Sequence, residues 1–146
     1  MGILFVSEDV PKPKISKKCI DLWLKSIINK NNFISGDITF IFCSDDYLLK
    51  INIDYLQHDY YTDIITFDYT LDSIISGDLY ISIDRVTENS LEYGTSFKWE
   101  LLRVIVHGIL HLLGYSDKSD EDRNNMRKLE DESLMLYKKI ENGYIE

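Results

Sequence analysis

The feature of this sequence that most constrains its fold is the apolar segment from residue 97 to residue 113. Its apolar run from Leu101 to Leu113 is interrupted by Arg103 and His107 and is too short to span a bilayer. Because it is apolar on nearly every side, it predicts a buried helix at the centre of the molecule, with Ser96 as its N-cap. Its polar residues recur every three or four positions and therefore share one face of the helix: Glu100, Arg103, His107, His111 and Gly114. We expect this face to line the active groove.

Two histidines on that face have the spacing of a metal site. His107 and His111 are four residues apart, so both imidazoles can point at one ion. Gly114 can end the helix in the left-handed conformation, and the following turn can carry Asp117 back toward the imidazoles. Three protein ligands and one open position are typical of catalytic zinc sites, so we expect Zn²⁺ or another divalent transition metal. The alternative is that both histidines are hydrogen-bonded core residues.

The residue after the first histidine bears on the kind of reaction. The full spacing H-x-x-x-H-x-x-G-x-x-D reproduces that of the metzincin zinc proteases, with aspartate as the third ligand. Those proteases carry a glutamate after the first histidine, where it acts as general base, whereas this chain has Gly108. A protease mechanism of that kind therefore lacks its base.

Two blocks of sequence resemble the YbeY family of bacterial rRNA-maturation endoribonucleases. The family signature H-G-x-L-H-L-x-G-Y-D-H is matched at His107, Gly108, Leu110, His111, Leu112, Gly114 and Tyr115. A second block is similar to the family's N-x-x-Y-R-x-x-D-x-x-T-D-V-L-S-F and G-D-I-x-I-S, at Asn52, Tyr55, Asp59, Thr62, Asp63, Phe67, Gly77, Asp78 and Ser82. The resemblance implies a metal-dependent endoribonuclease in 16S rRNA 3′-end maturation and ribosome quality control, with ribosomal RNA and the small ribosomal subunit as partners.

The chain departs from the family pattern at two functional positions. Asp117 stands where the family usually has a third histidine, and Leu56 stands where it usually has an arginine. The first change keeps a metal ligand, while the second removes a cation that the resemblance would assign to substrate binding or catalysis. Two alternatives therefore stay open: a metal-dependent hydrolase of another substrate such as a peptide, and a non-catalytic, ribosome-associated protein that binds metal.

The candidates for general base are Asp59, Asp63 and Asp78, which are named by the resemblance and by their positions in loops or at strand ends. Each of them could instead serve in turn hydrogen bonding or capping.

The net charge of −9 and the isoelectric point near 4.7 work against nucleic-acid binding, which draws on lysine and arginine. Much of the acid falls between residues 119 and 132, in a helix that we expect to be solvated and distant from the groove. Lys98 and Arg103, together with Arg85 and the metal, could then form a local positive strip that binds substrate. Glu100 and Arg103 could also form an ion pair within their own helix.

The remaining pattern predicts an α+β fold in one domain, residues 1–146, with a small mixed β-sheet packed by helices around the metal-binding helix. Strands are expected at 3–6, 37–43, 64–69 and 77–83, and the last two should pair antiparallel because their link is too short for a helical crossover. Further helices are expected at 15–31, from Ser44 to about residue 51, at 84–93, and after Ser119. Two cysteines without a C-x-x-C motif and an N-terminus unlike a signal peptide favour a cytoplasmic protein without membrane association.

Overall fold

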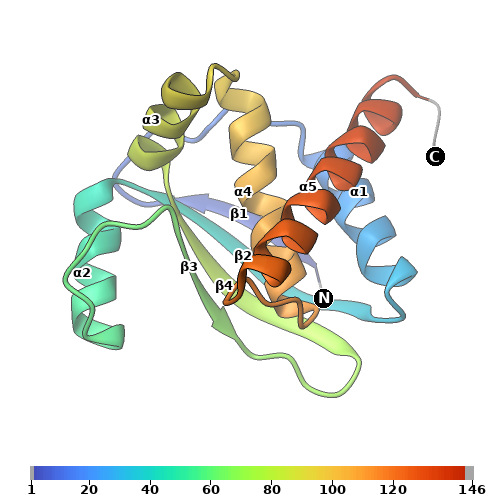
Figure 1. Cartoon of the computed structure of the whole chain (residues 1–146), viewed down its shortest axis with the longest axis horizontal. Helices are drawn as coiled ribbons and strands as arrows, with labels where there is room; N and C mark the ends of the chain where they lie inside the picture. The colour runs from blue at the N-terminus through green and yellow to red at the C-terminus, as the bar shows by residue number, and fades with distance from the viewer. Residues whose placement is uncertain (1, 144–146) are drawn as a thin grey trace.

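The sheet has four strands in a mixed arrangement, as the sequence predicts. The computed structural model describes residues 2–143. Its strands are β1 (Ile3–Ser7), β2 (Ile34–Cys43), β3 (Ile64–Asp68) and β4 (Ile74–Ser82), in the order β1-β2-β4-β3. β1, β2 and β4 are parallel to one another, and β3 pairs antiparallel with β4 (Figure 1). The predicted hairpin between β3 and β4 is therefore confirmed.

Within residues 2–143, five helices pack around this sheet: α1 (Lys17–Lys30), α2 (Asp45–Leu56), α3 (Ile83–Tyr93), α4 (Phe97–Leu112) and α5 (Asp120–Glu141). α4 packs on one face of the sheet against β3 and β4, and α1 and α5 pack beside it. α2 covers the other face, where its Leu48 meets Cys43 and Ile65. None of the helices within residues 2–143 is long and apolar enough to cross a membrane.

A serine begins every helix in the described part of the chain. In each case the side-chain oxygen accepts a hydrogen bond from the backbone N–H three residues later, at Ser16, Ser44, Ser82, Ser96 and Ser119. Such a cap stabilises a helix by about 1 kcal/mol relative to alanine. The sequence analysis placed the start of a helix at three of these serines, Ser44, Ser96 and Ser119, whereas α3 begins one residue before its expected start. α3 ends at Tyr93, as predicted, and Gly94 follows it with φ +67°.

Three elements extend by three or more residues beyond their predicted ends. β2 begins at Ile34 rather than Asp37 and β4 begins at Ile74 rather than Gly77, since Ile34 and Ser35 pair with the first residues of β4 before an irregularity in the register. α2 continues to Leu56, where Gln57 takes a left-handed conformation and the backbone N–H of His58 bonds to the carbonyl of Asn52. The spacing of apolar residues in the sequence did not indicate these extensions.

The core confirms α4 as the buried central helix. Ten of its sixteen residues are buried, and one of them, Gly108, lies against the sheet. A Cβ atom at this position would come within 2.4 Å of Leu79 Cδ2 and 2.8 Å of Ile64 Cδ1. This close approach fixes the rotation of α4 on the sheet and leaves the two histidines half-exposed beside β3.

Candidate metal centre

The three predicted ligands lie together at the C-terminal end of α4. Nε2 of His107 and Nε2 of His111 are 3.0 Å apart. Oδ2 of Asp117 lies 3.4 Å from the first nitrogen and 3.3 Å from the second. The three atoms therefore form a nearly equilateral triangle, and all three residues are partly exposed to solvent.

This triangle has the size that a tetrahedral ion requires. With metal–ligand bonds of about 2.0–2.1 Å, the edges of a tetrahedral site measure about 3.3–3.4 Å. Two imidazole nitrogens and one carboxylate oxygen are also ligand types that Zn²⁺ accepts. The residues present thus fit a metal ion, with one position left open toward solvent.

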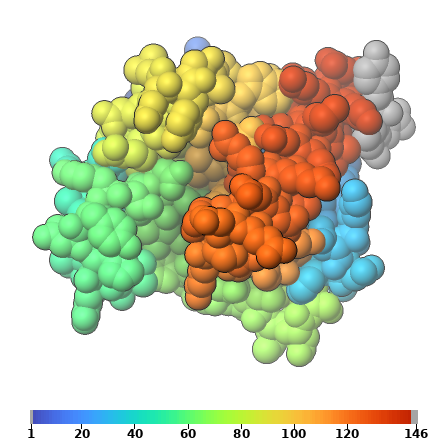
Figure 2. All heavy atoms as spheres, viewed as in Figure 1, coloured from blue at the N-terminus to red at the C-terminus, as the bar shows by residue number. Residues whose placement is uncertain are grey.

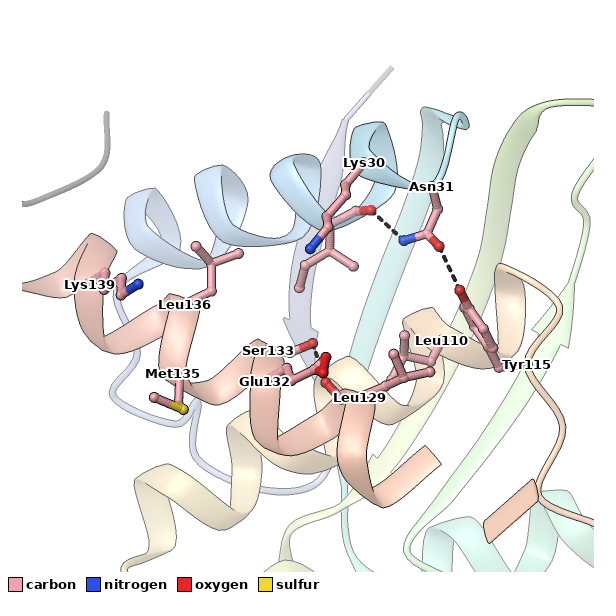
Figure 3. A pocket seen from close by; sticks show the side chains of 11 residues that line it. Lys30, Asn31, Leu110, Tyr115, Leu129, Glu132, Ser133, Met135, Leu136 and Lys139 are labelled. Atoms are coloured by element: carbon pink, nitrogen blue, oxygen red, sulfur yellow. Dashed lines mark hydrogen bonds between the residues drawn. The ribbon is translucent and has the colours of Figure 1, made fainter. Parts of the chain in front are cut away.

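The turn that returns Asp117 to the histidines is held by Tyr115. Gly114 has φ +101°, a conformation that side chains rarely adopt, and it reverses the chain after α4. The hydroxyl of Tyr115 then donates to Oδ1 of Asn31 at the end of α1, at 2.8 Å (Figure 3). Asn31 in turn donates to the carbonyl of Ile27. This hydrogen-bond chain connects the turn to a helix more than eighty residues away in sequence.

Tyr115 and Asn31 also line a cavity of about 450 Å³ between α1 and α5, which is shown in Figure 3. Its floor is apolar, with Ile27, Leu110 and Leu136 among the lining residues. None of the three metal-ligand candidates borders it, so we assign it no part in the metal centre.

A carboxylate that the sequence analysis missed supports the first histidine. Glu130 on α5 is only 5% exposed, and its Oε2 lies 2.6 Å from Nδ1 of His107. Its other oxygen accepts from Nη1 of Arg103 at 2.8 Å. Burial lowers the pKa of His107, but the hydrogen bond and the charge of Glu130 outweigh that effect, so the pKa is raised.

The expectation that the acidic C-terminal helix lies away from the groove is therefore wrong in part. The buried face of α5 repeats every three or four residues: Met126, Glu130, Ser133, Tyr137 and Ile140. Leu129 and Leu136, although apolar, are only partly buried. The sequence did contain a signal for this role: Glu130 falls at the spacing of the buried positions of α5, and a buried carboxylate needs a partner.

Asp63 is the predicted base that the structure brings to the site. It precedes β3 and lines an open pocket of about 280 Å³ together with all three ligands; Thr62, Ile64 and Thr66 complete the lining. Burial raises the pKa of Asp63, while the positive charge of a protonated His107 opposes this shift. In Figure 2 the green atoms of the chain around Asp63 and the orange atoms at the start of α5 both lie on the face toward the viewer.

The other two predicted bases are not brought to this pocket. Asp59 is exposed in the segment between α2 and β3 and does not line it. Asp78 is on β4, between Gly77 and Leu79, which both face α4. Because side chains alternate along a strand, Asp78 points to the opposite face, where it accepts a hydrogen bond from the Tyr69 hydroxyl at 3.3 Å.

The cations of the expected positive strip are engaged by carboxylates. Arg103 pairs with both Glu130 and Asp131 on α5 rather than with Glu100 on its own helix. Lys98 pairs with Glu141, and Arg85 pairs with Asp45 and Glu88. These pairs cancel much of the local positive charge that the sequence analysis expected. Among the residues that the structure describes, none that lines the ligand pocket is a lysine or an arginine.

Comparison with known proteins identifies relatives over most of the chain. The profile of the family "Endoribonuclease YbeY" matches residues 6–138. A protein of that name from Parabacteroides distasonis is 47% identical over 136 residues, which cover 93% of this chain and 96% of the relative. Another from Flavobacterium psychrophilum is 52% identical over 115 residues, 79% of this chain and 82% of the relative.

A solved structure agrees as well. The solution structure of a Thermotoga maritima protein superposes with a TM-score of 0.62 at 28% identity, covering 97% of this chain and 94% of that one. The match therefore extends over nearly the whole fold. Together with the family profile and the curated relatives, it shows that the chain belongs to the YbeY endoribonuclease family.

Proposed function

We propose that this chain is a metal-dependent endoribonuclease that acts, as a single domain in the cytoplasm, in 16S rRNA 3′-end maturation and ribosome quality control. The observation that carries the proposal is the triangle of ligand atoms from His107, His111 and Asp117. The small ribosomal subunit is the expected location of its substrate. Binding RNA that a ribosome already holds requires less free affinity from a chain with a net charge of −9.

Zn²⁺ is the ion that we propose for the site. Bound there, it would supply Lewis acidity toward a phosphoryl oxygen and lower the pKa of water. Asp63 is the residue that we propose as general base, because it shares the pocket with the ligands and burial raises its pKa above that of an ordinary aspartate, which makes it a stronger base. Glu130 orients His107, and the carboxylate of Asp117 reduces the net charge of the site by one unit relative to a third imidazole.

Hydrolysis of a peptide is the less favoured alternative. Position 108, where zinc proteases carry their glutamate, faces the sheet and has no room even for a Cβ atom without displacing Leu79. Among the residues described, the pocket lining contains no glutamate, and its acids are Asp63 and Asp117. A non-catalytic role on the ribosome remains the second alternative, and cleavage assays separate it from the proposal.

The test combines metal content with RNA cleavage. Purified protein should carry one equivalent of Zn²⁺ by elemental analysis, and it should cleave an RNA containing the 3′ end of precursor 16S rRNA. A chelator should abolish the cleavage.

His111→Ala should lose both the metal and the activity while its circular dichroism stays unchanged, because the rest of α4 still packs. His58→Ala removes the histidine outside the ligand group and should retain the metal. A full equivalent of zinc in His111→Ala would refute the site, and cleavage that persists in the chelator would refute the mechanism.

A further inference from the structure

Beside the ligand pocket, the last turn of α2 and the segment between α2 and β3 expose several aromatic rings. Tyr55, in α2, is 72% exposed, and in the segment that follows Tyr60 and Tyr61 are 55% and 50% exposed. His58, in the same segment, is exposed as well. Aromatic side chains normally bury most of their surface, so a group of them in one solvent-facing segment suggests a binding surface.

Two of these rings are already stacked. The rings of His58 and Tyr60 lie nearly parallel, with centroids 5.2 Å apart and planes 18° from each other. The Tyr60 hydroxyl lies 3.0 Å from Nδ1 of His58, within hydrogen-bond distance. A parallel pair of exposed rings can be extended by a third flat ring, as when a nucleobase stacks on an aromatic side chain.

The backbone of this segment is anchored rather than free. Asn52, which is 2% exposed, donates from its side chain to the carbonyl of Tyr60 at 2.8 Å. The carbonyl of Asn52 accepts from the backbone N–H of His58 at 3.0 Å. One buried residue therefore fixes both ends of the stacked pair, so the rings are held in place before any ligand arrives.

The stacked pair is close to the metal centre along the chain. Thr62 and Asp63 follow Tyr60 within three residues, and both line the pocket that contains His107, His111 and Asp117. Three residues of extended chain span at most about 10 Å. One short single strand can therefore reach the pocket and the rings together.

The charges near the surface limit what it can bind. Arg85, Arg103 and Arg123 each lie in an ion pair with a carboxylate. Arg127 is exposed and lines a neighbouring pocket with Asp63 and His107, so it is one cation that could still contact a phosphate. Leu56, at 40% exposure, supplies an apolar side chain just before the segment. A ligand held chiefly through its phosphates would meet few free cations here, whereas a ligand held through flat, uncharged rings would not need them.

We propose that His58 and Tyr60 form a stacking surface that binds an unpaired nucleobase of the RNA substrate next to the metal centre, and that stacking replaces much of the usual phosphate contact. The proposal rests on the proposed function, since it assumes an RNA substrate. A paired base is already stacked within its duplex and does not offer its faces, so this surface can bind only RNA that is single-stranded there.

Three variants, at two tyrosines of similar exposure, test the surface. Tyr60→Leu removes the ring and leaves the Asn52 anchor, which uses only the backbone carbonyl of residue 60. Tyr60→Phe keeps the ring. Tyr69→Leu is the matched control: Tyr69 is 59% exposed, but it follows β3 at the end remote from Asp63, about 20 Å away along an extended strand. Circular dichroism should be the same for all three.

Binding is measured by fluorescence anisotropy with metal-free protein, so that no cleavage follows, and a short labelled oligouridylate. We expect Tyr60→Leu to bind about 5- to 100-fold more weakly, the loss measured for single base–aromatic stacks, while Tyr60→Phe and Tyr69→Leu change affinity by less than about twofold. The affinity of the wild-type protein should fall with salt at a slope of about −0.7 to −1.4, as for one or two phosphate contacts.

An oligonucleotide of the same length with abasic central positions separates stacking from phosphate binding. Wild-type protein should bind it more weakly than the oligouridylate, and Tyr60→Leu should no longer distinguish the two. Equal affinity of the wild-type protein for both probes, or unchanged binding by Tyr60→Leu, overturns the stacking surface. If the zinc-loaded wild type cleaves RNA and Tyr60→Leu has the same KM, the surface alone is refuted. If the wild type neither binds nor cleaves RNA, the proposed function fails with it.

Discussion

His107 donates from Nδ1 to Oε2 of Glu130 across 2.6 Å, so the proton of the neutral imidazole is held on the nitrogen that faces away from the other two ligands. Nε2 then carries the lone pair that faces His111 and Asp117. Glu130 can hold the ring in this way because it is itself fixed by Arg103. An arginine that the sequence suggested for substrate contact is therefore part of the support for a metal ligand.

The first prediction concerns this support. Glu130 accepts from Arg103 and His107 at separate oxygens, and glutamine replaces one of these oxygens by an NH2 donor, so Glu130→Gln cannot accept from both groups in this geometry. If its amide group turns toward the ring, the imidazole proton moves to the metal-facing nitrogen. We expect zinc affinity to fall about 10- to 100-fold. Asp131→Asn removes the other carboxylate on Arg103, which does not touch the histidine, and should change the affinity by less than about threefold.

Nitrogen NMR of the metal-free variants gives a readout that does not depend on activity. The wild-type protein should show His107 protonated at Nδ1, and Glu130→Gln should shift the population toward the Nε2 tautomer. Zinc titration calorimetry gives the affinities. Equal losses in Glu130→Gln and Asp131→Asn would mean that the ion-pair network acts only on stability.

The second prediction concerns the third ligand. Asp117→Ala removes the only oxygen of the triangle and should weaken zinc binding by at least about tenfold, while Asp117→His should keep it, because the turn after Gly114 already delivers this position. Asp120→Ala is the control, since Asp120 is exposed and pairs with Arg123. Unchanged affinity in Asp117→Ala would reduce Asp117 to a turn residue.

The third prediction concerns the contact between α4 and the sheet. Gly108→Ala gains helix propensity of about 1 kcal/mol but forces Leu79 and Ile64 to move, and overpacking of a buried site costs about 1–3 kcal/mol. We expect a net loss of unfolding free energy, up to about 2 kcal/mol, in urea denaturation. Gly2→Ala, where a Cβ atom meets nothing within 4 Å, should be neutral. Greater stability of Gly108→Ala would show that the interface is loosely packed.

The fourth prediction is a pH dependence of stability. Burial raises the pKa of Glu100, which is 6% exposed, so the folded state holds this proton more tightly than the unfolded state does. The contribution of Glu100 to stability is therefore present at acidic pH and is lost as the pH rises through its raised pKa. Glu100→Gln should be more stable than the wild type at neutral pH, and the difference should vanish under acid. Thermal unfolding at several pH values, with the exposed Glu92→Gln as control, measures this; a destabilised Glu100→Gln at neutral pH would contradict it.

The fifth prediction concerns the two cysteines. Burial and nearby carboxylates raise the pKa of Cys43 to about 12, and its thiol is fully buried. Cys19 is partly exposed. Iodoacetamide reacts with thiolates, so native protein should gain no more than one adduct by mass spectrometry, at Cys19, and denatured protein should gain two. Rapid native labelling of Cys43 would show that the α2 side of the sheet opens readily.

Local sequence determined the elements and the ligand spacing. The helical repeat of α4, its serine cap, and the histidines four residues apart are properties of neighbouring residues, so they could be predicted without knowledge of any distant contact. The same holds for the glycine stops and for the β3–β4 hairpin, whose short link leaves no room for a crossover. These signals were sufficient to expect a mixed sheet with a central metal-binding helix.

Only the tertiary structure decided which distant residues meet at the site. Glu130 contacts His107 because α5 packs against α4. In the same contact Arg103, which the sequence suggested for phosphate binding, pairs with the buried Glu130. Asp78 does not line the pocket, because the register of β4 on β2 puts its side chain on the opposite face of the sheet, whereas Asp63 does line it. Side-chain direction in a sheet reverses with a shift of one residue, and ion pairs form between segments far apart in the chain. Neither is encoded in the local pattern, so each requires the packed fold.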